Sequence, residues 1–312
     1  MFTEKRLMFL YAVTPVHMGS GTALGLVDNP IQREVHTGHP VFAGAGIKGA
    51  FRHAARTLWK ATGENGEEHT DRARVEAVFG PDTDASERAG AISFTDAQIV
   101  AFPVRSLRQG YVYATSPSAL ARLFRMAEMA GAALPDARDL ASVGDEEACV
   151  AHEELLVDGA LVLEVYRFQS RPDASLGSVA KWLAGCALPE GEPHAFFREK
   201  LAKHLVLLSD TQFAFFARNS TSVEPHVRIN DATGTADDGG LFFTENLPPE
   251  SIMAGVLMAS DERQKKQHSG DGLLRASQIL GAITDTFGDR VVQIGGDATT
   301  GRGQVLVRFA GG

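Results

Sequence analysis

The sequence is poor in cysteine and has no long apolar run, and each absence removes a class of protein. Its 312 residues include only two cysteines, Cys149 and Cys186, which stand far apart in the chain. This usage does not indicate a disulfide scaffold or a structural zinc site. The first apolar run stops at Thr14-Pro15, too early for a signal peptide, and no stretch approaches membrane-spanning length. We therefore expect a cytoplasmic protein with no membrane partner.

The chain also lacks the positive charge of a generic nucleic-acid binder, because its formal net charge is −9. Its basic residues are nevertheless unevenly spread. Lys48, Arg52 and Arg56 recur at every fourth position, which places them on one face of a helix. Acidic residues gather elsewhere, in stretches such as 63–71 and 82–87. This distribution indicates a basic groove on an acidic body.

Glycine is abundant near the end of the sequence, between the strand-like runs 291–294 and 304–308. The loop 295–303 holds four glycines, two threonines and one arginine. Glycine lets a backbone approach a ligand closely, and the N–H groups of such a loop suit a phosphate. A hairpin turn needs only one or two glycines, so a plain connector explains part of the loop but not its length. Both readings, ligand contact and turn, stay open on this loop alone.

The order of the expected elements is α+β. Strand-like runs at 7–13, 91–102 and 251–259 are interspersed with helical patterns at 46–59 and 272–287. Other elements are expected as follows: strands at 40–42, 111–115 and 161–168, and helices at 72–79, 118–131 and 199–208. Because this order is not a regular βαβ alternation, it predicts a ferredoxin-like sheet that carries large insertions.

Three segments lie outside that pattern. Residues 60–90 and 132–160 are polar or acidic and are expected to be surface insertions. Residues 218–247 contain two strand-like runs around a turn-rich centre, which predicts a long hairpin. Phe242 and Phe243 on this hairpin would commonly pack inward, but on a hairpin that meets RNA they would wedge between bases.

Five motifs follow one another over the whole chain. They occupy residues 14–21, 25–34, 46–52, 102–107 and 294–303. Together they resemble the RAMP superfamily of CRISPR proteins, and most closely the repeated backbone subunit of the type III-B (Cmr) RNA-guided RNA-cleaving complex. The resemblance implies a single RAMP-type domain over 1–312, with a modified ferredoxin-like (RRM-like) palm and a β-hairpin thumb at 218–247.

The resemblance also implies a function. The subunit would stack in multiple copies along a CRISPR RNA guide and cleave complementary single-stranded target RNA at intervals of about six nucleotides. Its partners would be the guide, the target RNA, further copies of itself and the other Cmr subunits. Two alternatives remain: a non-catalytic guide-binding scaffold of the same complex, and a stand-alone CRISPR RNA-processing endonuclease.

Three candidate catalytic residues follow from the same resemblance. Asp28 matches the family's cutting aspartate, His17 matches a nearby histidine, and Glu245 falls near a helper acid, although Leu247 stands where an aromatic is expected. Asp28 would bind Mg²⁺ or another divalent cation, or accept the proton of the attacking hydroxyl. From the residues alone, the sequence around Asp28 favours a turn, and a lone loop histidine such as His17 is more often solvated. The turn and the catalytic role of Asp28 are compatible.

RNA contact is expected along the basic helix face and the glycine loop. A helix N-terminus favours anions, although charges at this spacing are also typical of the solvent face of a helix. The expected contacts are Lys48, Arg52, Arg105, Gly295, Gly296, Thr299, Gly301, Arg302 and Gly303.

Overall fold

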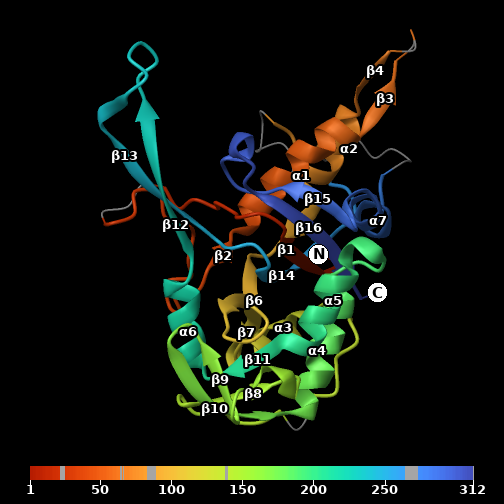
Figure 1. Ribbon diagram of the computed structural model, residues 1–312. Helices are drawn as coiled ribbons and strands as arrows, with labels where there is room; N and C mark the ends of the chain where they lie inside the picture. Colours follow the sequence, from red (N-terminus) through yellow and green to blue (C-terminus); the bar gives the residue numbers. More distant parts are fainter. Residues whose placement is uncertain are drawn as a thin grey trace.

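The core of the fold is a β-α-β-β-α-β unit. It is seen in a computed structural model, which describes residues 1–21, 25–63, 65, 67–82, 89–137, 140–263 and 273–311. In chain order the unit consists of β1 (Glu4–Ala12), α1 (Gly44–Leu58), β6 (Ala97–Arg105), β14 (Ile252–Ala259), α7 (Ala276–Phe287) and β16 (Gln304–Ala310). The strands lie in the order β16-β1-β14-β6, and each neighbouring pair is antiparallel (Figure 1). The predicted ferredoxin-like sheet is confirmed.

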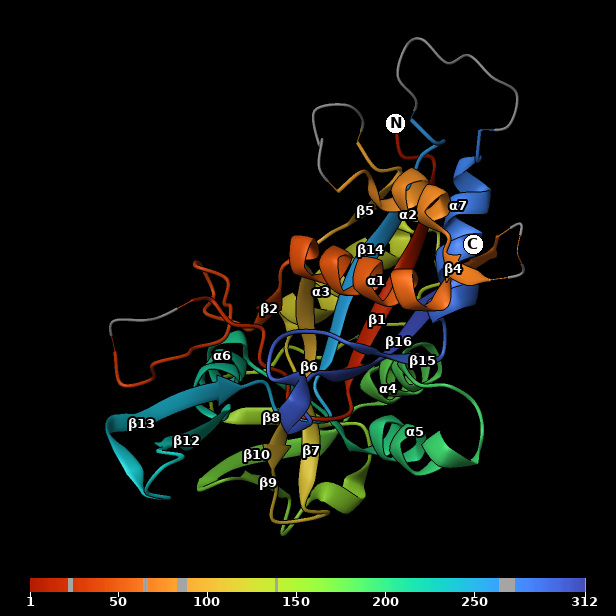
Figure 2. The ribbon, with the colours of Figure 1, turned by 90° about the horizontal axis from the view of Figure 1, so that it is seen from above.

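The central strand β1 is buried on both faces of this sheet. Its even-numbered residues from Met8 to Ala12 join one apolar core, together with residues of α1 and α7. Its odd-numbered residues from Leu7 to Tyr11 join a second core, together with α3 (Pro117–Met129), α4 (Ala174–Ala187) and α5 (Glu192–His204). Alternate residues of a strand point to opposite faces, so helices on both sides explain why β1 is apolar almost throughout. Figure 2 shows α1 crossing one face of this sheet.

Local signals explain where two of the helices begin. Ser116 accepts a hydrogen bond from the Ala119 amide, and Pro117 occupies the first turn of α3. Helix α1 starts at Gly44, where a Cβ atom would come within 2.3 Å of the Phe94 carbonyl oxygen. The glycine therefore allows the helix to begin directly against the strand region.

A long insertion between β6 and β14 extends the sheet. Its strands lie in the order β7 (Tyr111–Thr115), β11 (Leu205–Leu208), β8 (Glu147–Val150), β10 (Tyr166–Pro172) and β9 (Ala160–Leu163). The stretch 132–160, for which the sequence predicts no regular element, contains β8, which is an inner strand. The single strand expected at 161–168 is wrong, because the chain reverses at Glu164, with φ 51°. The helix expected to reach residue 208 ends at His204.

The remaining elements are short or project from the body. The predicted hairpin consists of β12 (Ser222–Ile229) and β13 (Ala236–Asn246), which follow α6 (Asp210–Asn219) and extend away from the sheet (Figure 1). The others are β2 (Val41–Phe42), β3 (Lys60–Thr62), β4 (Glu68–Thr70), α2 (Arg72–Phe79), β5 (Ile92–Phe94), β15 (Arg290–Gln293) and the 3₁₀ turns η1 (Glu153–Leu155) and η2 (Ala298–Thr300). Among the described helices, none has the length and apolarity needed to cross a membrane.

Candidate functional site

Three segments that are distant in the chain meet at the base of the β12–β13 hairpin. They are the loop after β1, the hairpin itself and the glycine loop between β15 and β16. Together they line a cleft of about 340 Å³, which we call the hairpin cleft. Its lining residues are His17, Asn29, His226, Phe242, Thr244, Asn246, Asp297, Thr300 and Arg302. The structure thus brings together three of the regions that the sequence motifs indicate.

The loop after β1 is fastened to β13 by backbone hydrogen bonds. The Asn29 amide donates to the Phe243 carbonyl at 3.0 Å, and the Glu245 amide donates to the Asn29 carbonyl at 2.9 Å. Val16 and Leu247 exchange a further pair of backbone bonds, each 2.9 Å long. These bonds fix the hairpin base against the loop that carries the first two candidate residues.

Asp28 is exposed at this junction. Its Oδ2 accepts a hydrogen bond from the Phe243 amide at 2.8 Å, so the residue anchors the hairpin. Asn29, the next residue, lines the hairpin cleft. The described residues contain no cluster of three or more His, Cys, Asp or Glu that could hold a metal ion. A Mg²⁺ ion bound here would have Asp28 as its one carboxylate ligand and would otherwise need water or phosphate ligands.

His17 is held in one tautomer by the backbone. Its Nδ1 lies 2.7 Å from the Glu245 carbonyl oxygen, which can only accept, so Nδ1 carries the proton. In the neutral ring Nε2 is therefore unprotonated and able to take a proton. A Cβ on Gly19 would come within 2.8 Å of Nε2, and one on Gly296 within 3.5 Å of Cδ2. Gly19 thus makes room for the imidazole, whereas a Cβ on Gly296 would lie at ordinary contact distance.

Glu245 does not present its carboxylate to the hairpin cleft. The side chain is buried and is engaged by Arg33 in an ion pair, by the Thr221 hydroxyl at 2.7 Å and by the Ile31 amide at 3.0 Å. Strand alternation places it on the face of β13 opposite Thr244. The helper acid expected at this position thus reaches His17 only through its backbone carbonyl. Its carboxylate holds residues 31–33 to the hairpin.

The glycine loop packs against the loop after β1, which corrects part of the phosphate expectation. The amides of Gly296 and Gly303 donate to the carbonyls of His17 and Pro15, both at 2.8 Å. Gly295 has φ +87°, and a Cβ there would lie 2.5 Å from the His17 carbonyl oxygen. These glycines serve close backbone packing, and two of the loop amides expected to meet phosphate are already used.

The other loop residues reach the cleft or stay open to solvent. Arg302 lines the cleft and forms an ion pair with Glu224 of β12. Gly301 has φ +81°, and a Cβ added there would have no atom within 4 Å, while Thr299 is exposed. Arg302 thus remains in place for an RNA contact, although it already has a carboxylate partner.

The basic face of α1 borders a separate cleft of about 420 Å³ that includes Lys48, Arg52 and Gly80. Arg52 donates to the Gly80 carbonyl at 2.7 Å, and both Arg52 and Arg56 pair with Asp82. Burial lowers the pKa of Lys48, and this lysine has no carboxylate partner within the described ranges. Of the basic stripe, Lys48 is therefore the residue best placed to meet a phosphate.

Arg105 is not brought to either cleft. It is exposed at the end of β6, where its carbonyl accepts a hydrogen bond from the Glu164 amide at 3.0 Å. The RNA contact expected for Arg105 would therefore belong to a different surface from that of His17 and Asp28.

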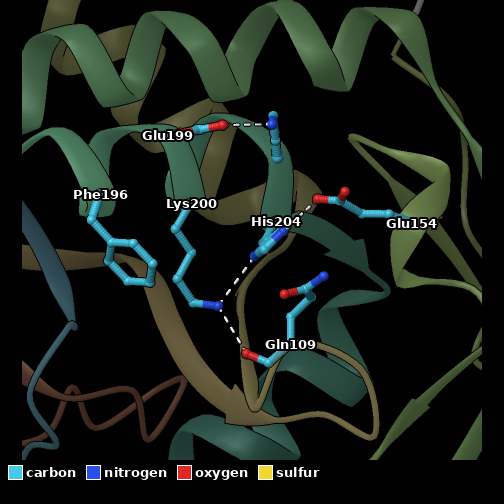
Figure 3. Close-up of a pocket in the computed structure, with 7 residues that line it drawn as sticks. Gln109, Glu154, Phe196, Glu199, Lys200 and His204 are labelled. Carbon is cyan, nitrogen blue, oxygen red and sulfur yellow. Dashed lines mark hydrogen bonds and ion pairs between the residues drawn. The ribbon is translucent and has the colours of Figure 1, made fainter.

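A third cavity, of about 290 Å³, lies beside α5 and was not foreseen from the sequence (Figure 3). Lys200 Nζ donates to the Gln109 carbonyl at 2.9 Å and to His204 Nδ1 at 3.1 Å. Because an ammonium group only donates, His204 carries its proton on Nε2, which donates to Glu154 Oε1 at 2.6 Å. We call these three side chains the α5 relay. Only the spacing of Lys200 and His204 on one helix face could have indicated it.

Burial and hydrogen bonding shift the titration of the α5 relay. Burial lowers the pKa of Lys200 and the pKa of His204. The hydrogen bond from His204 lowers the pKa of Glu154. Lys200 also lies 4.3 Å from the centre of the Tyr111 ring. Each member of the relay thus has a partner for its charged or polar atoms.

Comparison with known proteins gives one consistent result. The RAMP superfamily model matches residues 9–306. The chain is 34% identical over 309 residues to the CRISPR system Cmr endoribonuclease Cmr4 of Pyrococcus furiosus, covering 96% of this chain and 94% of that protein.

Solved structures agree in fold. The crystal structure of oligomeric Cmr4 from Pyrococcus furiosus superimposes with a TM-score of 0.70 at 26% identity, and covers 98% of each chain. A subunit in the cryo-EM structure of the type III-B Cmr-beta bound to cognate target RNA has the same TM-score at 18% identity, covering 99% of this chain and 98% of that one, and shares the fold. With its family match over nearly its whole length, the chain belongs to the RAMP superfamily, in the family of Cmr4.

Proposed function

We propose that this chain is the backbone subunit of a type III-B CRISPR effector complex, in which it binds the guide RNA and cleaves the complementary target RNA. The observation that carries the proposal is the hairpin cleft. It places His17 and the Asp28-Asn29 junction at the base of a projecting hairpin. The relative with 34% identity is named an endoribonuclease of the Cmr system. A guide-processing enzyme that works alone is not favoured by these relatives.

The hairpin has the position needed to act as a thumb. A stacked RNA strand keeps its 2′-hydroxyl out of line with the adjacent phosphate, and displacing one base removes that restraint. His226 and Phe242 on the hairpin stack on each other, with ring centroids 5.2 Å apart and an interplanar angle of 20°. This pair offers an aromatic surface to a displaced base at the edge of the hairpin cleft.

The residues beside the displaced nucleotide supply the chemistry. His17 Nε2 accepts the proton of the 2′-hydroxyl, whose oxygen attacks the adjacent phosphorus while the bond to the 5′-oxygen breaks. The leaving 5′-oxygen takes a proton from water, which gives a 2′,3′-cyclic phosphate and a 5′-hydroxyl. Asp28 would hold Mg²⁺, which when bound neutralises charge on the phosphate. The Glu245 carbonyl keeps His17 in the required tautomer.

Guide binding is assigned to the surface along α1. Lys48 has no carboxylate partner in the described ranges, and Gly46 packs against Met18, the neighbour of His17. Guide phosphates held at this helix would thus run close to the loop of the hairpin cleft. The oligomeric state of the related Cmr4 supports stacking of copies along the guide.

The first prediction tests the cleavage role. In a complex assembled with guide RNA and incubated with complementary RNA and Mg²⁺, Asp28→Ala should abolish products spaced by about six nucleotides, a loss of at least ~100-fold. Assembly and guide content should stay unchanged. Chelation of divalent ions should have the same effect on the unmodified complex. Gel analysis of end-labelled target gives the measurement.

The matched control is Asp285→Ala, which removes an exposed carboxylate on α7, away from the hairpin. It should cut at the unmodified rate. Regular cutting by the Asp28→Ala complex would overturn the assignment of Asp28. An unmodified complex that binds the target without cutting would instead favour the non-catalytic scaffold.

A further inference from the structure

Asn246 is a buried polar side chain without partners. It is 1% exposed, and neither its Nδ2 nor its Oδ1 has a hydrogen-bond partner in the part of the chain that the structure describes. A buried carboxamide that makes no hydrogen bonds costs free energy, and the great majority of buried polar groups are paired. A leucine of similar size would avoid that cost. The fold alone therefore gives no reason for an asparagine here.

The backbone around Asn246 is firmly held. Asn246 pairs with Ser222 across the hairpin. The carbonyl of its neighbour Glu245 accepts a hydrogen bond from His17, and Leu247 exchanges backbone hydrogen bonds with Val16. The side chain is thus fixed at the floor of the hairpin cleft, which it helps to line.

The neighbours of Asn246 in the cleft are chemically similar to it. Strand alternation places Phe242, Thr244 and Asn246 on the same face of β13, and all three line the cleft. Thr244 is 3% exposed and accepts a hydrogen bond from Asn29 Nδ2 at 3.4 Å. The floor of the cleft consequently carries neutral groups that both donate and accept, beside the aromatic surface of His226 and Phe242.

This composition suits one nucleotide better than a phosphate alone. A carboxamide both donates and accepts, and so do a ribose 2′-hydroxyl and the edge of a base. A phosphate only accepts and would leave Oδ1 unpaired. We propose that Asn246 is a specificity-determining residue whose carboxamide pairs with a neutral donor–acceptor group, the 2′-hydroxyl or the base edge, of one target nucleotide seated in the hairpin cleft.

The inference rests on the proposed function, because it takes the target strand to enter this cleft. Both polar atoms of Asn246 lie just beneath the cleft surface. The contact therefore requires a local opening of the residues that cover the carboxamide, to admit either the nucleotide itself or one bound water that serves both partners. In either form it requires a group at position 246 that can donate and accept.

The test is the variant Asn246→Leu in the assembled complex. Because the substitution removes two unpaired buried atoms, the melting temperature of the subunit should stay equal or rise, and guide content should stay unchanged. Affinity for complementary target RNA, measured in the Asp28→Ala background, should fall roughly 3- to 10-fold. The matched control is Ser106→Ala, which removes a buried hydroxyl that also has no partner in the described chain, near the far end of β6. It should change neither quantity.

Two sets of modified target RNAs distinguish the 2′-hydroxyl from the base edge as the group that pairs with Asn246. In one set a single 2′-deoxy nucleotide is moved along the target, and in the other a single base is replaced by an analogue with an altered edge. The unmodified complex should lose affinity at one position in each repeat, in one of the two sets. The Asn246→Leu complex should be insensitive at that same position.

Three outcomes would overturn the inference: a clear loss of melting temperature, unchanged target affinity, or equal sensitivity of both complexes to every modified target. Failure of Asn246→Leu to fold counts as such a loss only if Asn246→Ala, whose smaller side chain cannot overpack the site, also loses melting temperature. An unmodified complex that fails to bind complementary RNA would sink the proposed function itself. If the complex binds and cuts the target, but substitution of Asn246 does not change target affinity, only this inference is contradicted.

Discussion

The hairpin cleft and the α5 relay each hold a histidine, yet their hydrogen bonding differs in kind. In the relay Lys200, His204 and Glu154 bond to one another and to the Gln109 carbonyl. In the cleft His17 is bonded through Nδ1 only, and Asn246 has no partner within the described residues. The pKa of each relay side chain is shifted by burial or by a hydrogen bond, whereas the cleft has the unmet polar atoms.

The difference shows which observation points to a ligand. A buried titratable group that is fully paired is explained by the fold, since it links α5 to the turn after β6 and to η1. A buried polar group without a partner costs stability and calls for another explanation. We therefore assign a structural role to the relay and binding of RNA to the cleft, and the following substitutions test that division.

The largest effect is expected in the cleft, for Gly295→Ala. The new Cβ would lie 2.5 Å from the His17 carbonyl oxygen at φ +87°, so the loop must shift and carry His17 with it. We expect a loss of stability of ~3 kcal/mol and a fall in cleavage rate of roughly 100-fold. Thermal unfolding and single-turnover cleavage measure the two quantities.

Gly301→Ala is the control for Gly295→Ala. Its φ of +81° imposes similar backbone strain, but its Cβ position has no neighbour within 4 Å. It should cost ~1 kcal/mol and leave cleavage within about twofold. Equal effects of the two substitutions would show that the loop does not position His17.

An intermediate effect is expected in the relay, for Lys200→Met. The substitution leaves the Gln109 carbonyl and His204 Nδ1 without their donor, which should cost ~1 to 3 kcal/mol. Cleavage per assembled complex should stay unchanged, because the relay does not meet RNA. Lys181→Met, at an exposed position of α4, should be silent in both assays. A cleavage defect in stable Lys200→Met complexes would break the division between the two sites.

The smallest effect concerns Glu250, which accepts a hydrogen bond from the Tyr113 hydroxyl at 3.3 Å. Burial raises the pKa of Glu250 to about 7, above its unfolded value of 4.5. The folded state therefore binds the proton more tightly, and this contribution to stability is present at low pH and lost as pH rises through about 7. Between about pH 6.5 and 8 the loss should be ~0.5 to 1 kcal/mol.

Glu250→Gln should remove this pH dependence. Most of the acid range lies outside the chosen window; in that range the lowered pKa of His204 causes stability to fall as pH decreases below its unfolded value of 6.5, and both proteins share this effect. Melting temperatures of both proteins, measured at several pH values, give the comparison. Parallel curves for the two proteins would contradict a buried, titrating Glu250.

The core of the fold could be predicted because its signals are periodic. The apolar run of β1 indicates a strand that is buried on both faces. The spacing of Ile47, Phe51 and Ala55 indicates a helix with one buried face. The inserted half was harder to predict. Strand β8 is four residues long within an acidic stretch, and β11 follows α5 without a glycine or proline between them. The reversal at Glu164 uses a non-glycine residue at positive φ, which no turn motif signals.

The candidate site divides in the same way. The loops around His17, Asp28 and Gly295 were located by their motifs, because glycines and turn residues are visible in a sequence. The Glu245 carboxylate is engaged by Arg33 and Thr221, which lie far from it in the chain. The lack of partners for Asn246 within the described residues depends on the hairpin register. Both features depend on contacts between segments that are far apart in the chain, and such contacts cannot be predicted from local sequence patterns.

The strand order has a consequence for how the chain is made. Leu7 in β1 pairs with Val256 on one side and with Ala310 on the other. Strand β1 therefore waits, with both edges open, until the chain has been synthesised as far as β14, and its second edge stays open until β16 follows. Pairings this remote form slowly. A nascent chain of this kind needs protection of its leading strand, and we expect its yield in a foreign host to depend on chaperone supply more than on the strength of its finished core.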